Sequence, residues 1–165
     1  MIKFARAKKA SKPKKQYVES IAYFQAIILV IIAFMQLYSL QDFLAILQNL
    51  DLGTRSQTYL VGCFIIWAEI FSLPFLLRMK LSIAFRVFSM LLLWSVTIFW
   101  LYLSVWLTSS IQDPVESGLL GGIVPVDSGI QLFVFAILFG ACSINNIWGL
   151  WPLKRNKLAK LLKMN

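Results

Sequence analysis

Residues 21–40 read IAYFQAIILVIIAFMQLYSL, a stretch without a charged side chain. Because a helix rises about 1.5 Å per residue, such a stretch crosses the roughly 30 Å hydrocarbon core of a bilayer. Three further apolar stretches occupy residues 59–77, 83–107 and 130–150. Backbone polar groups in lipid must bond within their own segment, so each stretch is predicted to be an α-helix.

The sequence therefore predicts an all-α integral membrane four-helix bundle, with one transmembrane domain over residues 1–165. The composition agrees, since 59% of residues are hydrophobic and 14% are charged, against about 25% charged in soluble domains. A cleaved signal peptide would have a shorter apolar region of about 7–15 residues. The first stretch is longer and is predicted to remain as an uncleaved anchor.

The positive charges predict the orientation of the bundle. The chain carries 16 Lys and Arg against 7 Asp and Glu. Fifteen of the 16 basic residues lie in the two tails or near the turn between the second and third spans, where Arg86 lies at the start of the third span. The exception is Arg55. The positive-inside rule then places both termini in the cytoplasm, with basic tails at 1–20 and 151–165. Anionic lipid headgroups are the expected partners of these residues. Because the basic residues flank membrane spans, nucleic acid is not an expected partner.

The residue inventory argues against several kinds of site. The chain contains no histidine, and Cys63 and Cys142 lie singly inside apolar stretches. Lone buried cysteines usually act as small hydrophobic residues, and these two lie towards opposite ends of their spans, too far apart for a disulfide. We therefore expect no metal site and no catalytic residue set.

Two segments outside the spans leave alternatives open. Leu40, Phe43, Leu44, Leu47 and Leu50 are spaced as on one face of a helix, which predicts either a short amphipathic helix on the outer leaflet or a continuation of the first span. The loop at 109–129 is rich in glycine and proline. It either dips back into the protein or covers the helix ends, and the second is preferred. The leucines and lysines of the C-terminal tail predict a helix on lipid headgroups.

Glu69 is the main candidate for a functional residue. It lies near the middle of the second span, where a charged acid costs about 2.5–3.5 kcal/mol. We therefore predict that it faces the interior, on one helix face with Gly62, Ile66 and Ser72. It would handle a proton, bind a polar ligand or make a structural hydrogen bond. Arg86 is a candidate ion partner, although its side chain could instead reach the lipid headgroups.

Polar and small residues form stripes on the other spans and predict which helix faces meet. If the stripes converge on Glu69 they line a small polar pocket, and otherwise they only pack the helices. The candidate polar residues besides Glu69 are Arg86, Gln25, Gln36, Ser72, Ser89 and Asn145. The stripes comprise Ala22, Gln25, Ala33 and Gln36; Arg86, Ser89, Thr97 and Ser104; and Ala136, Gly140 and Ser143, with Asn145 and Asn146 just below. Pro74 is expected to kink the second span.

Residues 67–82, WAEIFSLPFLLRMKLS, resemble the DoxX/MauE-like family of small four-span membrane proteins. Such proteins similarly carry a glutamate in the second span, then an apolar run and a short basic turn. The likeness extends over about residues 20–150. It implies a bacterial cell-membrane (plasma or inner membrane) protein linked to a redox system, with quinone as the one cofactor suggested. The family's thiol-active branch carries cysteines in the last outer loop, and residues 109–129 contain none, so disulfide exchange is not expected.

Two functions follow as expectations. The first is a non-catalytic membrane subunit of a redox or quinone-linked system, bound to a membrane-protein partner or to copies of itself. The second is a small transporter or channel subunit with Glu69 as a proton or cation site. The sequence shows no acid–base–nucleophile set that would support catalysis by the chain alone.

Overall fold

The computed structural model describes residues 13, 15–49, 54–110, 117–122 and 130–150. The helices of this part of the chain are α1 (Gln16–Tyr38), α2 (Leu40–Asn49), α3 (Arg55–Leu76), α4 (Ile83–Ser110) and α5 (Ile130–Gly149). Four of them, α1, α3, α4 and α5, are long and apolar enough to cross a membrane. The predicted all-α four-helix bundle is therefore confirmed.

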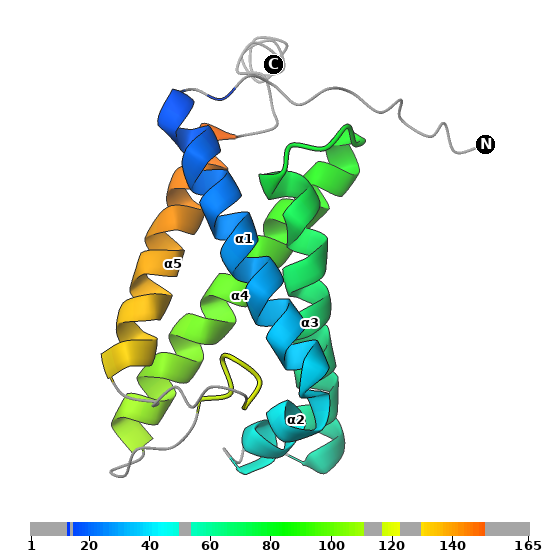
Figure 1. Cartoon of the computed structure of the whole chain (residues 1–165), viewed down its shortest axis with the longest axis vertical. Coiled ribbons are helices and arrows are strands. Elements are labelled where there is room, and N and C mark those ends of the chain that lie inside the picture. The colour runs from blue at the N-terminus through cyan, green and yellow to red at the C-terminus, as the bar shows by residue number, and fades with distance from the viewer. Residues whose placement is uncertain (1–12, 14, 50–53, 111–116, 123–129, 151–165) are drawn as a thin grey trace, which may run out of the picture.

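The four long helices pack side by side, with α4 against both α3 and α5 and with α1 across α3 and α5 (Figure 1). The start of α1, the turn between α3 and α4 and the end of α5 lie at one end of the bundle, while α2 and residues 117–122 lie at the other. The basic α3–α4 turn therefore lies at the same end of the bundle as the start of α1 and the end of α5, as the charge pattern predicts. The tails at 1–12 and 151–165 lie outside the described residues.

Helix α1 begins at Gln16, five residues before the predicted span. Its first turn carries Glu19, whose carboxylate forms an ion pair with Arg78 at 2.6 Å. Arg78 lies in the α3–α4 turn and has a positive φ of 53°. The ion pair ties the start of α1 to this turn and lets a polar first turn precede the apolar span.

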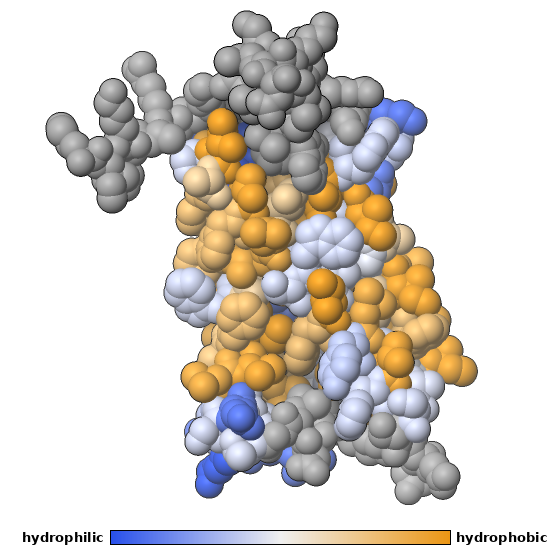
Figure 2. Space-filling model, turned by 180° about the vertical axis from the view of Figure 1, so that it is seen from behind, coloured by the Kyte–Doolittle hydropathy of each residue, from blue (hydrophilic) through white to orange (hydrophobic). Residues whose placement is uncertain are grey.

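The bundle has apolar side chains outside and polar side chains inside. Phe24, Phe34, Leu60 and Leu138 are each more than 60% exposed, whereas Glu69 and Asn146 are fully buried. Figure 2 shows the same pattern on one face, where hydrophobic residues cover the middle and hydrophilic residues gather towards the ends. This distribution suits a protein whose solvent is lipid, because lipid leaves polar groups no partner outside the bundle.

The predicted interior faces are correct with one exception, Asn145, which is only half-buried. The other members of the stripes predicted on the four spans are buried: Ala22, Gln25, Ala33 and Gln36 on α1; Gly62, Ile66, Glu69 and Ser72 on α3; Arg86, Ser89, Thr97 and Ser104 on α4; and Ala136, Gly140, Ser143 and Asn146 on α5. Helical periodicity was sufficient here because lipid and interior select opposite faces of each helix.

The amphipathic segment forms a separate helix, which decides between the two alternatives left open. The chain breaks at Ser39, whose backbone angles (φ −113°, ψ 46°) are not helical. Helix α2 then packs its apolar face on α3 beside Gly62, where a Cβ would come within 2.5 Å of Leu44 and 3.2 Å of Leu47. Gly62 therefore permits the close approach of α2 to α3.

Residues 117–122, part of the predicted loop at 109–129, are packed into one end of the bundle, and they both reach inward and cover the end of α1. Residues 111–116 and 123–129 of this loop lie outside the described residues, so the choice between the two alternatives for the whole loop stays open. Ser117 and Leu119 are buried, and Ser39 hydrogen-bonds the carbonyl of Gly121. Gly118, Gly121 and Gly122 all have positive φ, a backbone conformation that glycine adopts without strain. The tight turn places this segment against α1 and α2 at one end of the bundle.

Candidate functional site

The carboxyl group of Glu69 lies at the centre of a buried polar cluster. Glu69 on α3 has no exposed surface, and its Oε1 accepts a hydrogen bond of 3.3 Å from Nε1 of Trp100 on α4. The side chain of Gln36 on α1 lies beside the same carboxyl. Three spanning helices thus meet at one acidic group, as the sequence predicts for a carboxyl in lipid.

Gln36 connects this carboxyl to the inserted loop. Its Nε2 donates to the carbonyl of Leu119 at 3.2 Å. We call Gln36, Glu69, Trp100 and the Leu119 carbonyl the carboxyl cluster. The cluster joins α1, α3 and α4 to residues 117–122, so the loop and the spans share one hydrogen-bonded unit.

Two oxygen atoms of the carboxyl cluster are unsatisfied. Within the described residues, Oε2 of Glu69 and Oε1 of Gln36 have no hydrogen-bond partner. Both accept hydrogen bonds when the acid is ionised, so neither can then satisfy the other. A donor would satisfy both, and the chemically suitable donors are a proton on the carboxyl or a hydroxyl group of a ligand. The arrangement can therefore bind a proton or a hydrogen-bond donor.

Arg86 is not the partner of Glu69. Its Nη2 donates to the carbonyl of Met79 at 3.3 Å, so the guanidinium points to the α3–α4 turn. Across the described residues, the polar neighbours of the Glu69 carboxyl are Trp100 and Gln36, and it forms no ion pair with Arg86. The proposed Glu69–Arg86 ion pair is therefore absent, because the shallower Arg86 reaches the nearer carbonyl of the turn.

Ser72 and Ser89 lie together where Pro74 interrupts α3, and neither contacts the carboxyl of Glu69. Ser72 donates to the Glu69 carbonyl at 2.7 Å. Ser89 on α4 donates to the Phe71 carbonyl at 2.6 Å and accepts from the Phe75 amide at 3.1 Å. These two backbone groups are partners in a regular helix, so the hydroxyl of a neighbouring helix bridges them at the site of the proline. The two serines are structural.

Gln25 belongs to a second buried cluster, which we call the amide cluster. Its Nε2 donates to Ser143 at 2.7 Å, and its Oε1 accepts from Asn146 at 2.7 Å. Thr97 on α4 lies 2.9 Å from the same Ser143 hydroxyl. The amide cluster thus joins α1, α4 and α5. No described hydrogen bond links it to the carboxyl cluster, so the predicted convergence of every stripe on Glu69 is only partly correct.

Asn146 takes the place that the sequence interpretation gave to Asn145. Asn146 is fully buried and follows Ser143 by three residues on the same helix face, whereas Asn145 is only half-buried. The correct choice was available from the helical spacing, because residues three apart share a face.

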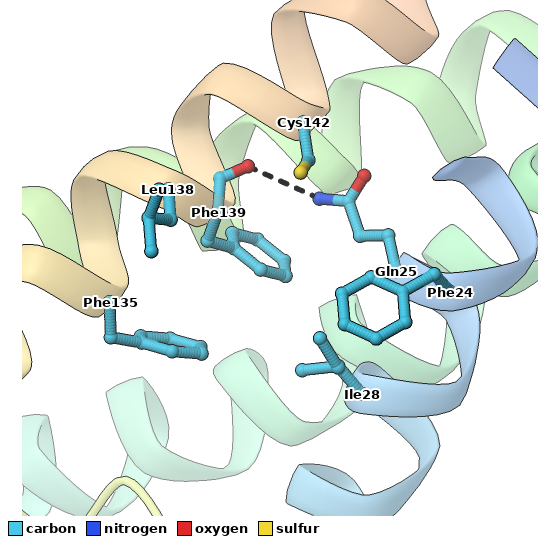
Figure 3. Close-up of a pocket in the computed structure, with 7 residues that line it drawn as sticks. All are labelled: Phe24, Gln25, Ile28, Phe135, Leu138, Phe139 and Cys142. Carbon is cyan, nitrogen blue, oxygen red and sulfur yellow. Dashed lines mark hydrogen bonds between the residues drawn. The ribbon is translucent and has the colours of Figure 1, made fainter. Parts of the chain in front are cut away.

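A pocket of about 190 Å³ lies between α1 and α5 beside the amide cluster. Its walls are formed by Phe24, Gln25, Ile28, Phe135, Leu138, Phe139 and Cys142. Figure 3 shows the Gln25 amide pointing across to α5, where it bonds the Phe139 carbonyl. Gln25 is therefore the one amide side chain that lines this otherwise apolar pocket, and its polar atoms are already hydrogen-bonded to α5.

Sequence reasoning missed Trp100 and the Leu119 carbonyl. The polar stripes read from the sequence do not include Trp100, yet its indole N–H supplies the hydrogen bond to Glu69. The general rule that a buried indole N–H finds a partner was the signal that could have found it. The Leu119 carbonyl carries no side-chain signal, so only the three-dimensional structure identifies it.

Replacement of Trp100 by phenylalanine should lower the free energy of unfolding by about 1–2 kcal/mol, because it leaves the buried carboxyl without its donor. Chemical unfolding in detergent micelles would measure this loss. In a Glu69→Leu background the same change should cost much less, since no carboxyl remains. Equal costs in the two backgrounds would contradict the hydrogen-bond explanation and favour loss of packing alone.

No protein-family model, curated protein or solved structure matches this chain. Among the described residues, no group of three or more His, Cys, Asp and Glu side chains is placed to hold a metal ion. Cys63 is exposed, Cys142 is half-buried, and both are free thiols. The site chemistry of the described residues therefore centres on one carboxyl group and its hydrogen-bonding neighbours.

Proposed function

We propose that this protein is a non-catalytic membrane subunit of a redox or quinone-linked system, with the carboxyl cluster as its polar site. The resemblance of residues 67–82 to the DoxX/MauE-like family supports the proposal, and Glu69 is the residue of that block which forms the cluster. The observation that carries the proposal is the pair of unsatisfied acceptors, Glu69 Oε2 and Gln36 Oε1. A quinol hydroxyl or a transferred proton has the donor chemistry that these atoms lack.

The same observation favours a second function, a small transporter subunit in which Glu69 binds a proton. A buried carboxyl among transmembrane helices is a common element of proton relays. Four spans enclose little space for a larger substrate, and the described pocket lies beside Gln25 rather than beside Glu69. Under this alternative the transported species is a proton or a small cation, and several copies of the chain assemble.

Purification from native membranes in a mild detergent tests the first function. We expect the wild-type chain to retain a membrane-protein partner or an isoprenoid quinone, and Glu69→Gln to retain less quinone because an amide changes the donor and acceptor pattern. Ser95→Ala is a suitable control, since among the described residues the Ser95 hydroxyl bonds only the Leu91 carbonyl of its own helix. Recovery of the chain with neither a partner nor a quinone would contradict the first function.

A flux assay in proteoliposomes tests the second function. Proton flux that depends on the wild-type chain and is abolished by Glu69→Gln would support the transporter. Flux that is equal in both proteins would exclude Glu69 as the proton site, because the amide of Gln carries no titratable proton. The Ser95→Ala protein should match the wild type in this assay.

A further inference from the structure

The pocket between α1 and α5 lies at the depth of the hydrocarbon core. Phe24 is eight residues into α1 and Leu138 is eight residues into α5, so each lies about 12 Å from the start of its helix. The two helices span the membrane with opposite directions. Lipid headgroups lie at the ends of such helices, so the groups that reach this pocket from the bilayer are hydrocarbon.

The pocket opens to the outside of the bundle. Phe24 and Leu138, which stand at its edge, are 61% and 62% exposed. The inner wall is buried and includes Phe139 and Gln25. A molecule can therefore enter sideways from the membrane without crossing the interior.

The lining selects an apolar occupant. Gln25 is the only wall residue with an amide, and its Nε2 and Oε1 are bonded to Ser143 and Asn146. Apart from the half-buried thiol of Cys142, the remaining walls are hydrocarbon or aromatic. A polar headgroup would find no free partner on these walls, and water does not fill apolar cavities of this kind.

The walls are held in place by contacts that the lining residues make with one another and with the rest of the bundle. The Gln25–Asn146 and Gln25–Ser143 hydrogen bonds hold α1 and α5 at a set spacing, and Phe135 stacks on Phe139 with ring centroids 5.6 Å apart. An apolar cavity of about 150 Å³ is large enough to bind benzene. The pocket is larger than that, so it has room for a segment of an alkyl or isoprenoid chain.

From these features we infer that the α1–α5 pocket is a binding site for one hydrocarbon chain of a membrane lipid. The inference goes beyond the proposed function, because it concerns a different site and requires no redox activity. The bound hydrocarbon chain belongs either to a phospholipid or to an isoprenoid quinone, because both lipids carry the apolar chain that the pocket walls select.

Cys142 provides a direct test because its thiol lines the pocket. A Cys63→Ser protein, stripped of lipid in detergent, would be alkylated with N-ethylmaleimide before and after addition of dioleoyl phosphatidylglycerol or of an isoprenoid quinone. We expect at least one of the two to slow alkylation of Cys142 several-fold. The reciprocal Cys142→Ser protein is the matched control, and alkylation of the exposed Cys63 should be unchanged.

An Ile28→Trp variant adds a second arm, because the larger side chain fills the pocket from α1. Native mass spectrometry should find one retained lipid on the wild type and none on Ile28→Trp. Ile144→Trp is the control and should retain the lipid, because Ile144 is exposed on α5 and does not line the pocket. Slower alkylation by phosphatidylglycerol alone identifies a phospholipid site and leaves the proposed function untouched. If neither lipid slows alkylation, or if Ile28→Trp keeps its lipid, the pocket is not a chain-binding site.

Discussion

Replacing Gly121 by alanine is expected to destabilise the protein by about 2–5 kcal/mol. Its φ of +65° costs an L-residue about 1–2 kcal/mol. A Cβ at this position would also come within 2.6 Å of the Met35 carbonyl oxygen and 2.9 Å of Gln36 Cα. These are backbone atoms, so a side-chain rotation cannot relieve the contact, and overpacking of this kind costs about 1–3 kcal/mol more.

The unfolding free energy of Gly121→Ala in mixed micelles, followed by circular dichroism, measures this effect. Gly140→Ala is the matched control, because a Cβ there would meet Thr97 and Leu101 only at 3.6 and 3.7 Å, in ordinary contact. Gly140 lies inside α5, where alanine is favoured over glycine by about 1 kcal/mol. The control should therefore be neutral or stabilised. Similar stabilities for both variants would show that residues 117–122 are not seated against α1.

This prediction also bears on the carboxyl cluster, because Gln36 contacts both the loop and Glu69. If Gly121→Ala displaces the loop, Gln36 Nε2 loses its hydrogen bond to the Leu119 carbonyl, and the Gln36 amide is no longer held in place beside the carboxyl of Glu69. The position of residues 117–122 and the hydrogen bonding of Glu69 are thus coupled through the side-chain amide of Gln36. The proposed ligand site and the outer loop form a single structural unit for this reason.

Gln25→Leu is expected to reduce the free energy of unfolding by about 1–2 kcal/mol. The leucine fills a similar volume but removes the acceptor of Asn146 Nδ2 and the donor to Ser143. Interhelical hydrogen bonds in membranes contribute about 0.6 kcal/mol on average and up to about 1.7 kcal/mol. The expected loss lies towards the upper value because Asn146 Oδ1 is already unsatisfied among the described residues, so the variant leaves the whole amide without a partner.

A double variant tests whether the loss comes from the unpaired amide. Replacing both partners of a buried hydrogen bond by apolar groups is often nearly neutral, so Gln25→Leu with Asn146→Leu should recover part of the stability lost by Gln25→Leu alone. Gln131→Leu, an exposed change on α5, serves as the control for the substitution itself. Additive losses from Gln25→Leu and Asn146→Leu would contradict the pairing.

The two clusters serve different purposes in the bundle. Three hydrogen bonds connect the four side chains of the amide cluster, Gln25 to Ser143, Asn146 to Gln25 and Thr97 to Ser143. The amide cluster therefore ties α1, α4 and α5 together. The carboxyl cluster instead keeps two unsatisfied acceptors at the depth of the spans. Unsatisfied buried groups are costly. The amide cluster also contains one, Asn146 Oδ1, but only in the carboxyl cluster does one belong to an ionisable group, which is the reason to seek the protein's function at Glu69 rather than at Gln25.

Much of the architecture followed from the sequence. The span lengths, the buried face of each span and the placement of the α3–α4 turn at the same end as the start of α1 and the end of α5 depend on local rules, because lipid imposes its requirement on every helix separately. Glu69, Gln36 and Gln25 could be placed in the interior on the same basis. Whether residues 40–50 form a separate helix or continue the first span was ambiguous because the amphipathic pattern suits both, and the break at Ser39 decided it.

Only the tertiary structure decided which polar groups meet. Trp100 and Glu69 are 31 residues apart in sequence, and Asn146 and Gln25 are 121 apart. Such pairs depend on the rotation and crossing of whole helices, which many small packing contacts set together. No single residue encodes them, whereas the choice between lipid and interior is made by each side chain alone.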